Sequence, residues 1–164
     1  MNPALKAFLF PKPTPAFFVR AASVALGAFL FFQFILTPFV VRGASMEPAY
    51  HDGTLHFVLK TRYWFGAPEP GDVVAVRLAG ERVFYLKRVV AVAGQRVAFA
   101  DGVLQVDGRP VDEPYVLGPC DWNLEPRDVQ PGNVYLVGDN RSMPMEAHDF
   151  GQAPVRRVVG APLW

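Results

Sequence analysis

An uncharged run near the amino terminus constrains this chain more than any other feature of its sequence. From Ala21 to Val41 no side chain carries a charge, and Gln33 is the only strongly polar one. As an α-helix, such a run would be about 31 Å long, close to the thickness of a bilayer's hydrocarbon core. The apolar part of a cleavable targeting peptide is shorter, and a core helix would carry a polar stripe. We therefore predict a transmembrane helix over residues 21–41.

The cations that flank this run predict its orientation. Lys6, Lys12 and Arg20 precede it, whereas Arg42 alone follows it closely. Because the more positive flank of a membrane helix usually stays in the cytoplasm, we expect residues 1–20 to form a cytoplasmic tail. Residues 43–164 are then a domain on the outer face of the cytoplasmic membrane.

Short alternating apolar runs follow residue 43, and they are separated by turns that contain glycine and proline. Such runs are typical of β-strands, and none of them keeps a helical period. Two Asp-Gly pairs, at 101–102 and 107–108, are signals of tight hairpin turns. The pattern predicts a mostly β domain with an antiparallel or barrel-like sheet. The predicted strands are 55–59, 72–77, 82–92, 96–99, 103–106 and 134–137, and the predicted long loops are 61–71 and 118–133.

Charge and cysteine content narrow the possible partners. The net charge is +1, which gives no reason to expect a nucleic-acid partner. The single cysteine, Cys120, can form neither an intramolecular disulfide nor a cysteine-rich zinc site. Because the histidines also lack ligand spacing, we predict no metal and no cofactor.

Two residues of the domain have the chemistry of a nucleophile and a base. Ser45 lies in the run 43–48, directly after the predicted helix, where small neighbours leave its hydroxyl accessible. Lys87 and Arg88 lie within an apolar strand, and adjacent strand residues face opposite sides. If Arg88 points to solvent, Lys87 points inward. Burial lowers the pKa of a lysine from about 10.4, and a neutral amine can accept the proton of a serine hydroxyl.

Other interpretations of the same residues stay open. Lys87 can instead reach the surface, or pair with Asp139 or Glu146. A Ser-His-Asp arrangement is a further alternative. The chain's histidines are His51, His56 and His148. The first two follow Ser45 too closely in the sequence to return easily from the opposite side of a site.

Four segments in order resemble bacterial signal peptidase I, a family of Ser/Lys serine endopeptidases. The segments are Ser45–Pro48, Gly71–Val74, Tyr85–Val90 and Gly138–Arg141. The segments Glu113–Tyr115 and Val158–Gly160 fit the family as well, and the likeness covers the chain from about Phe31 to Trp164.

The resemblance implies a membrane-bound endopeptidase that removes signal peptides from exported preproteins. Its partners would be signal peptides and the lipid bilayer. Ser45 would be the nucleophile, with its backbone N–H in the oxyanion hole, and Lys87 would be the general base. Gly43 stands where many relatives have a second oxyanion donor, a serine. The implied substrate-binding residues are Met46, Phe84, Tyr85 and Leu86, and the implied supporting residues are Gly138, Asp139, Asn140, Arg141, Ser142 and Glu146.

The chain departs from the family pattern after Arg141. Pro144 stands in the place of a serine that orients the lysine amine in relatives, and it has no hydroxyl. Glu146 and His148 stand in the places of an aspartate and an arginine, and their ion pair would be weaker and sensitive to pH. Ser142 can take over the role of the missing serine.

Two other functions share some of these features. A self-cleaving Ser/Lys protease of the SOS-repressor kind has the same dyad and a β-fold. That kind is soluble and usually carries a DNA-binding helix-turn-helix, where this chain has the apolar run. A membrane-tethered peptide-binding protein of the same fold, with weak or no catalysis, is the second alternative, and Pro144 is the residue that supports it.

Overall fold

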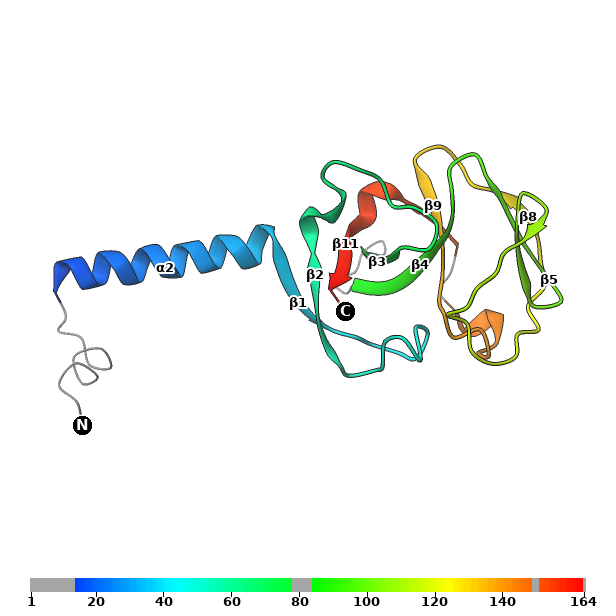
Figure 1. Ribbon diagram of the computed structural model, residues 1–164, viewed down its shortest axis with the longest axis horizontal. Helices are drawn as coiled ribbons and strands as arrows, with labels where there is room; N and C mark the ends of the chain where they lie inside the picture. Colours follow the sequence, from blue (N-terminus) through cyan, green and yellow to red (C-terminus); the bar gives the residue numbers. More distant parts are fainter. Residues whose placement is uncertain (1–13, 78–83, 149–150, 164) are drawn as a thin grey trace.

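The structure is a computed structural model that describes residues 14–77, 84–148 and 151–163. It consists of one amino-terminal helix and a β domain with two antiparallel sheets. Figure 1 shows the helix projecting from one end of the β domain, with strands β5 and β8 at the other end. Most of the predicted tail, up to residue 13, lies outside the described residues.

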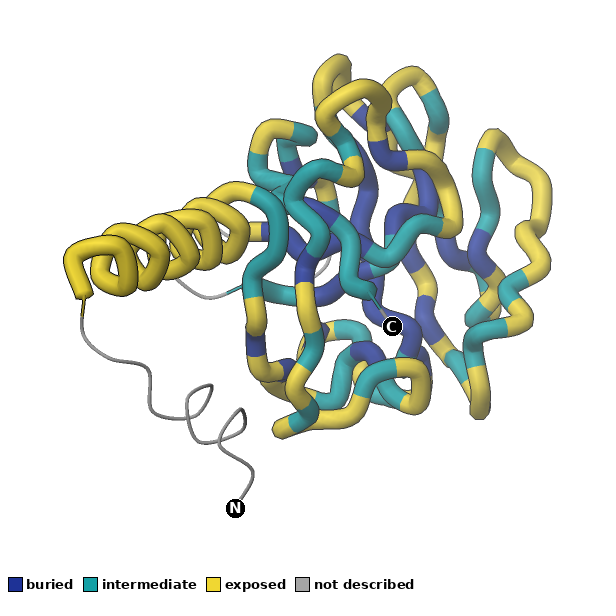
Figure 2. The backbone as a smooth tube through the Cα atoms, turned by 60° about the vertical axis from the view of Figure 1, so that its left-hand side comes forward, coloured by how far each residue is buried: buried dark blue, intermediate teal, exposed yellow. Residues whose placement is uncertain are grey.

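The helix α2 (Pro15–Phe34) begins where the sequence provides a cap. The Thr14 side chain accepts a hydrogen bond from the Phe17 backbone N–H at 3.2 Å, and Pro15 occupies the first helical position. All 20 residues of the helix are exposed, as the yellow tube in Figure 2 shows. It is the one helix among the described residues that is long and apolar enough to cross a membrane.

The predicted helix bounds of 21–41 differ from the observed ones at both ends. The helix starts at Pro15 and therefore contains Arg20, and it ends at Phe34. Residues 36–40 form strand β1 (Leu36–Val40), which pairs with β2 (Leu55–Leu59) from Leu36↔Leu59 to Val40↔Leu55. Pro38 has no backbone N–H for a helix, and apolar content alone does not separate the end of a helix from an apolar strand.

The larger sheet carries the core of the domain. Its seven strands are β1, β2, β11 (Val158–Leu163), β3 (Val73–Arg77), β4 (Phe84–Val92), β9 (Asn133–Val137) and β10 (Gly151–Pro154), in that order across the sheet. Strand β4 contributes a residue to each of three apolar clusters: Leu86, Val89 and Val90. Packing in all three clusters therefore fixes the position of β4.

The smaller sheet is built on a hairpin that the sequence predicts. Its strands are β7 (Arg109–Pro110), β6 (Val103–Val106), β5 (Arg96–Ala100) and β8 (Leu124–Asp128), in that order. At the turn between β5 and β6, Asp101 and Gly102 have φ angles of 48° and 79°. Two consecutive positive φ angles are those of a type I′ hairpin turn, which the Asp-Gly pair favours.

Sequence patterns identified the buried strands better than the edge strands. All six predicted strands are present, although residues 82 and 83 lie outside the described residues. The prediction of a loop over 118–133 is wrong in part, because β8 lies within it. In β8 only Leu124 is buried, and Pro126 is tolerated because β8 is at the edge of its sheet. The other strands without a predicted counterpart are β1, β7, β10 and β11.

The two hairpin glycines provide a matched test of this fold. A Cβ at Gly102 would overlap the carbonyl oxygen of Cys120, whereas a Cβ at Gly108 would meet nothing within 4 Å. Both have positive φ, 79° and 74°, so both substitutions with alanine carry the same backbone strain. We expect Gly102→Ala to lower the melting temperature clearly more than Gly108→Ala. Equal shifts would contradict the close packing of the 120–122 segment on this turn.

Candidate active site

Ser45 lies in the loop that joins β1 to β2. The loop is closed by a hydrogen bond from the Gly43 N–H to Asp52 Oδ1 at 2.8 Å and by one from the Gly53 N–H to the Val41 carbonyl at 3.0 Å. The next residue, Met46, is 1% exposed and belongs to the same apolar cluster as Leu86. Met46 therefore anchors the loop in the apolar core, while Ser45 stays half-buried at the surface.

Strand β4 places Lys87 against this serine. The side chain of Lys87 is buried, and its Nζ lies 3.0 Å from Ser45 Oγ, within hydrogen-bond distance. The two residues are 42 positions apart in the sequence, so only the fold brings them together. Removal from water disfavours the charged form of an amine. A buried amine on a serine hydroxyl is the arrangement that nucleophilic catalysis requires of a base and its nucleophile.

Arg88 does not point to solvent, so the condition from which an inward Lys87 was argued is not met, although Lys87 is buried. Its Nε and Nη2 donate to the two carboxylate oxygens of Asp139 at 2.8 and 2.6 Å, and its Nη1 donates to the Gly71 carbonyl. The guanidinium also lies 3.7 Å from the centre of the Tyr115 ring. Burial lowers the pKa of the Arg88 guanidinium, but the hydrogen bonds that it donates to Asp139, together with the negative charge of that carboxylate, outweigh burial and raise the pKa overall. Asp139 is thus the counter-ion of Arg88.

A second ion pair ties the 113–115 segment to the same turn. Arg141 is 1% exposed, and two of its nitrogens donate to the two carboxylate oxygens of Glu113 at 2.7 and 2.6 Å. The Arg141 Nε donates to the Gly138 carbonyl at 2.8 Å. Tyr115 donates its hydroxyl to Glu113, and burial together with this bond raises the pKa of the Tyr115 phenol. Both arginines that flank the site therefore have bidentate carboxylate partners.

The turn 138–140 contacts the loop that carries Ser45. The backbone N–H of Asn140 donates to the Ser45 carbonyl, and its side-chain Nδ2 donates to the Ala44 carbonyl, both at 3.0 Å. A Cβ on Gly138 would overlap the Ser45 carbonyl oxygen, so the approach requires glycine there. Ser142 donates its hydroxyl to Asn140 Oδ1 at 2.7 Å. Ser142 thus orients the Asn140 amide. The role predicted for it was a different one, that of the serine that orients the lysine amine in relatives.

A small pocket opens beside Ser45. It is lined by Phe39, Val41, Arg42, Gly43, Ser45, Met46, Phe84, Tyr85 and Leu86. The four residues that the resemblance marks for substrate binding are therefore together, and they adjoin the candidate nucleophile. Most of the lining is apolar.

The residues after Arg141 are arranged differently from the sequence-based expectation. Pro144 precedes the short 3₁₀ helix η2 (Met145–Ala147), on which Glu146 is exposed. His148 is buried, and its Nε2 lies 2.7 Å from the Asn140 carbonyl oxygen. Glu146 and His148 are both among the described residues, and they do not form the predicted ion pair with each other.

The other two histidines lie away from the serine hydroxyl. His51 is exposed and lies 3.9 Å from Glu47, and His56 Nε2 contacts the Thr54 hydroxyl at 3.1 Å. The described structure brings Lys87, and none of the three histidines, to Ser45 Oγ at hydrogen-bond distance. Trp122, which packs against the His148 ring, was not predicted as part of the site. Because tryptophan is largely buried on average, its presence in a stretch predicted as a loop was the signal that this stretch packs against the core.

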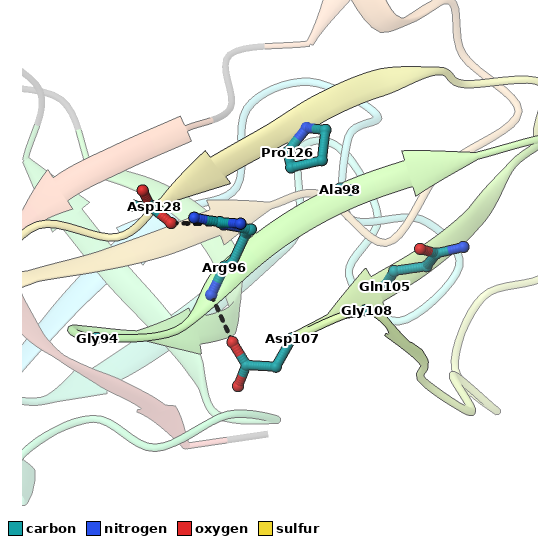
Figure 3. Close-up of a pocket in the computed structure, with 8 residues that line it drawn as sticks. All are labelled: Gly94, Arg96, Ala98, Gln105, Asp107, Gly108, Pro126 and Asp128. Atoms are coloured by element: carbon teal, nitrogen blue, oxygen red, sulfur yellow. Dashed lines mark hydrogen bonds and ion pairs between the residues drawn. The ribbon is translucent and has the colours of Figure 1, made fainter.

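A larger pocket, of about 510 Å³, lies on the smaller sheet and is separate from this site. Figure 3 shows Arg96 of this pocket bonded to Asp107 and to Asp128. The Arg96 backbone N–H donates to Asp107 at 2.8 Å, and the Arg96 Nε donates to Asp128 at 2.7 Å. Because both members of the Arg96–Asp128 pair are largely exposed, we assign no chemistry to this pocket.

Comparison with known proteins gives a consistent set of relatives. A family model described as signal peptidase, peptidase S26, matches residues 16–163. A probable signal peptidase I-1 from Synechocystis sp. is 30% identical, over 94% of this chain and 85% of the relative. A signal peptidase I from Bacillus licheniformis is 32% identical, over 87% of this chain and 83% of the relative. A crystal structure of a signal peptidase I from Enterococcus faecalis V583 is 21% identical with a TM-score of 0.48, over 57% of this chain and 95% of that chain.

The Arg88–Asp139 pair gives a test of the electrostatics of the site. Its side chains are 12% and 0% exposed, so Asp139→Asn leaves the charge of Arg88 with a weaker partner in a poorly hydrated place. We expect this variant to lower the free energy of unfolding by about 3–5 kcal/mol, measured by urea unfolding in detergent. Asp128→Asn, in the exposed Arg96–Asp128 pair, is the control and should have a far smaller effect. Similar losses in the two variants would contradict the buried ion pair.

Proposed function

Since the chain belongs to the signal peptidase family, peptidase S26, and is a peptidase of that family, we propose that it cuts exported preproteins with Ser45 as nucleophile and Lys87 as general base. One observation carries this proposal: the buried Lys87 amine lies 3.0 Å from Ser45 Oγ. The substrates of the family are exported preproteins with signal peptides.

In the first half of the reaction a proton moves from serine to lysine. The neutral Lys87 amine accepts the Ser45 hydroxyl proton as Oγ attacks the scissile carbonyl carbon. The resulting ammonium then donates a proton to the leaving amine when the peptide bond breaks, which leaves an acyl ester on Ser45. In the second half Lys87 takes a proton from water, the hydroxide attacks the ester, and Ser45 Oγ regains its proton from Lys87.

The oxyanion of each tetrahedral intermediate needs a donor near Ser45. The backbone N–H of Ser45 is the donor that we propose. Gly43 is exposed and contributes no side-chain hydroxyl. The hydrogen bonds of Asn140 to the Ala44 and Ser45 carbonyls hold this part of the backbone in place, which supports a preorganised oxyanion site.

The pocket beside Ser45 suits an extended peptide with small side chains. Its lining includes Phe84, Tyr85 and Leu86 of β4, and Val41 and Arg42 of the segment after β1. We propose that the substrate adds as a strand along these segments. The pocket residues Met46 and Leu86 are buried in the core, so little depth is left for large side chains at the –1 and –3 positions.

We propose that α2 anchors the enzyme in the cytoplasmic membrane. The helix has 20 residues, none of them buried, and an 18-residue window of it has a mean hydropathy of 1.8. Its length as a helix, about 30 Å, fits the hydrocarbon core. Arg20 lies within the helix, close to its amino-terminal end, and so belongs near the cytoplasmic interface. The domain that carries Ser45 is then on the outer face, where signal peptides emerge.

Replacing each member of the dyad should abolish cleavage while the fold stays intact. Ser45→Ala and Lys87→Ala should each lower kcat by at least about 10³-fold with a preprotein that carries an Ala-X-Ala site. Ser23→Ala and Lys60→Ala, which change a serine in the helix and a lysine that bonds the Gln33 carbonyl, are the controls and should cleave normally. Full cleavage by Lys87→Ala would exclude the dyad. Binding of the preprotein by the unmodified chain without cleavage would favour the tethered peptide-binding alternative.

The pH dependence of cleavage reports the protonation of the base. Below the pKa of Lys87 the amine is an ammonium and has no lone pair to accept the serine proton. The value of kcat/KM should therefore rise about tenfold per pH unit with increasing pH and then level off once the lysine is neutral. A rate that falls with rising pH over this range, or does not depend on pH, would contradict a lysine base.

A further inference from the structure

His148 is a buried residue beside the site, and the proposed reaction of Ser45 and Lys87 does not use it. The imidazole is 6% exposed and lies edge-on to the Trp122 ring, with ring centres 4.7 Å apart. Gly138 is also close to the ring, since a Cβ there would come within 2.9 Å of His148 Cε1. The ring thus fills the space between Trp122 and the turn 138–140, and Trp122 is itself held by a hydrogen bond from its Nε1 to the Met143 carbonyl at 2.9 Å.

The hydrogen bond of His148 fixes which nitrogen carries a proton. Its Nε2 lies 2.7 Å from the Asn140 carbonyl oxygen, and a carbonyl can only accept. The Nε2 is therefore the donor, and it donates whether the ring is neutral or charged. A buried polar side chain that keeps such a bond holds its partner in one position.

The partner is the residue that holds the nucleophile loop. Asn140 receives the bond from His148 at its carbonyl, and it donates its own N–H to the Ser45 carbonyl and its Nδ2 to the Ala44 carbonyl. One continuous set of hydrogen bonds thus joins His148 through Asn140 to the backbone of Ser45. A shift of the Asn140 peptide would move Ser45 relative to Lys87.

We propose that His148 is a positioning residue for the nucleophile, acting through Asn140. This inference rests on the proposed function of Ser45 and Lys87. None of the residues that line the pocket beside Ser45 belongs to the turn 138–140 or to His148. Loss of the His148 bond should therefore lower kcat and leave KM nearly unchanged, because substrate contacts stay intact while the reacting atoms are misplaced.

Two substitutions separate the hydrogen bond from the packing of the ring. His148→Gln keeps an N–H donor at a similar reach and loses the ring, whereas His148→Phe keeps a ring against Trp122 and loses the donor. We expect kcat of His148→Phe to fall about 10- to 100-fold, and kcat of His148→Gln to stay close to that of the unmodified enzyme. Equal kcat values for the two variants, or a lower value for His148→Gln, would overturn the proposal.

A measurement on the unmodified protein covers the case in which a variant does not fold. Nitrogen-15 NMR of the detergent-solubilised chain, with histidine labelled in the ring, reports which ring nitrogen is protonated. We expect Nε2 of His148 to carry a proton, and an unprotonated Nε2 would overturn the proposal. Failure of the dyad looks different: the unmodified chain would not cleave, or Ser45→Ala would cleave equally well, whatever the result at His148.

Discussion

The hydrogen bond between Lys87 Nζ and Ser45 Oγ is the interaction on which the rest of the site depends. On one side of this bond, β4 is held by apolar packing in three clusters. On the other, the loop of Ser45 is held by Met46 in the apolar core and by the hydrogen bonds of Asn140. A buried amine is costly when it is charged. In the proposed mechanism this amine is neutral and acts as the base.

Two arginines near this pair have carboxylate partners of their own. Arg88, next to Lys87 on the strand, bonds both carboxylate oxygens of Asp139, and Arg141 bonds both carboxylate oxygens of Glu113. These ion pairs also hold the turn 138–141 in place. The same turn supplies the N–H and amide groups that hold the Ser45 backbone, so the electrostatic and the positioning parts of the site share one structural element.

The sequence predicted the elements with a strong local pattern and missed those that depend on distant partners. The buried strands and the Asp101-Gly102 turn followed from alternation and turn chemistry. Strand β8 did not, because an edge strand with one buried residue resembles a loop. The proximity of Ser45 and Lys87 was predictable from the segments that resemble the family, Ser45–Pro48 and Tyr85–Val90. The direction of Arg88 was not, because its partner Asp139 lies 51 residues away.

The protonation of Lys87 tests this account most directly. The chain has four lysines, Lys6, Lys12, Lys60 and Lys87, so carbon-13 labelling at the ε carbon gives few NMR signals to assign in detergent. A Lys87→Arg variant identifies the signal of Lys87 by its disappearance. We expect this signal to titrate at a clearly lower pH than a lysine side chain in water, because burial disfavours the ammonium. Titration of the Lys87 signal at about 10.4, the value in water, would contradict a neutral amine held against Ser45.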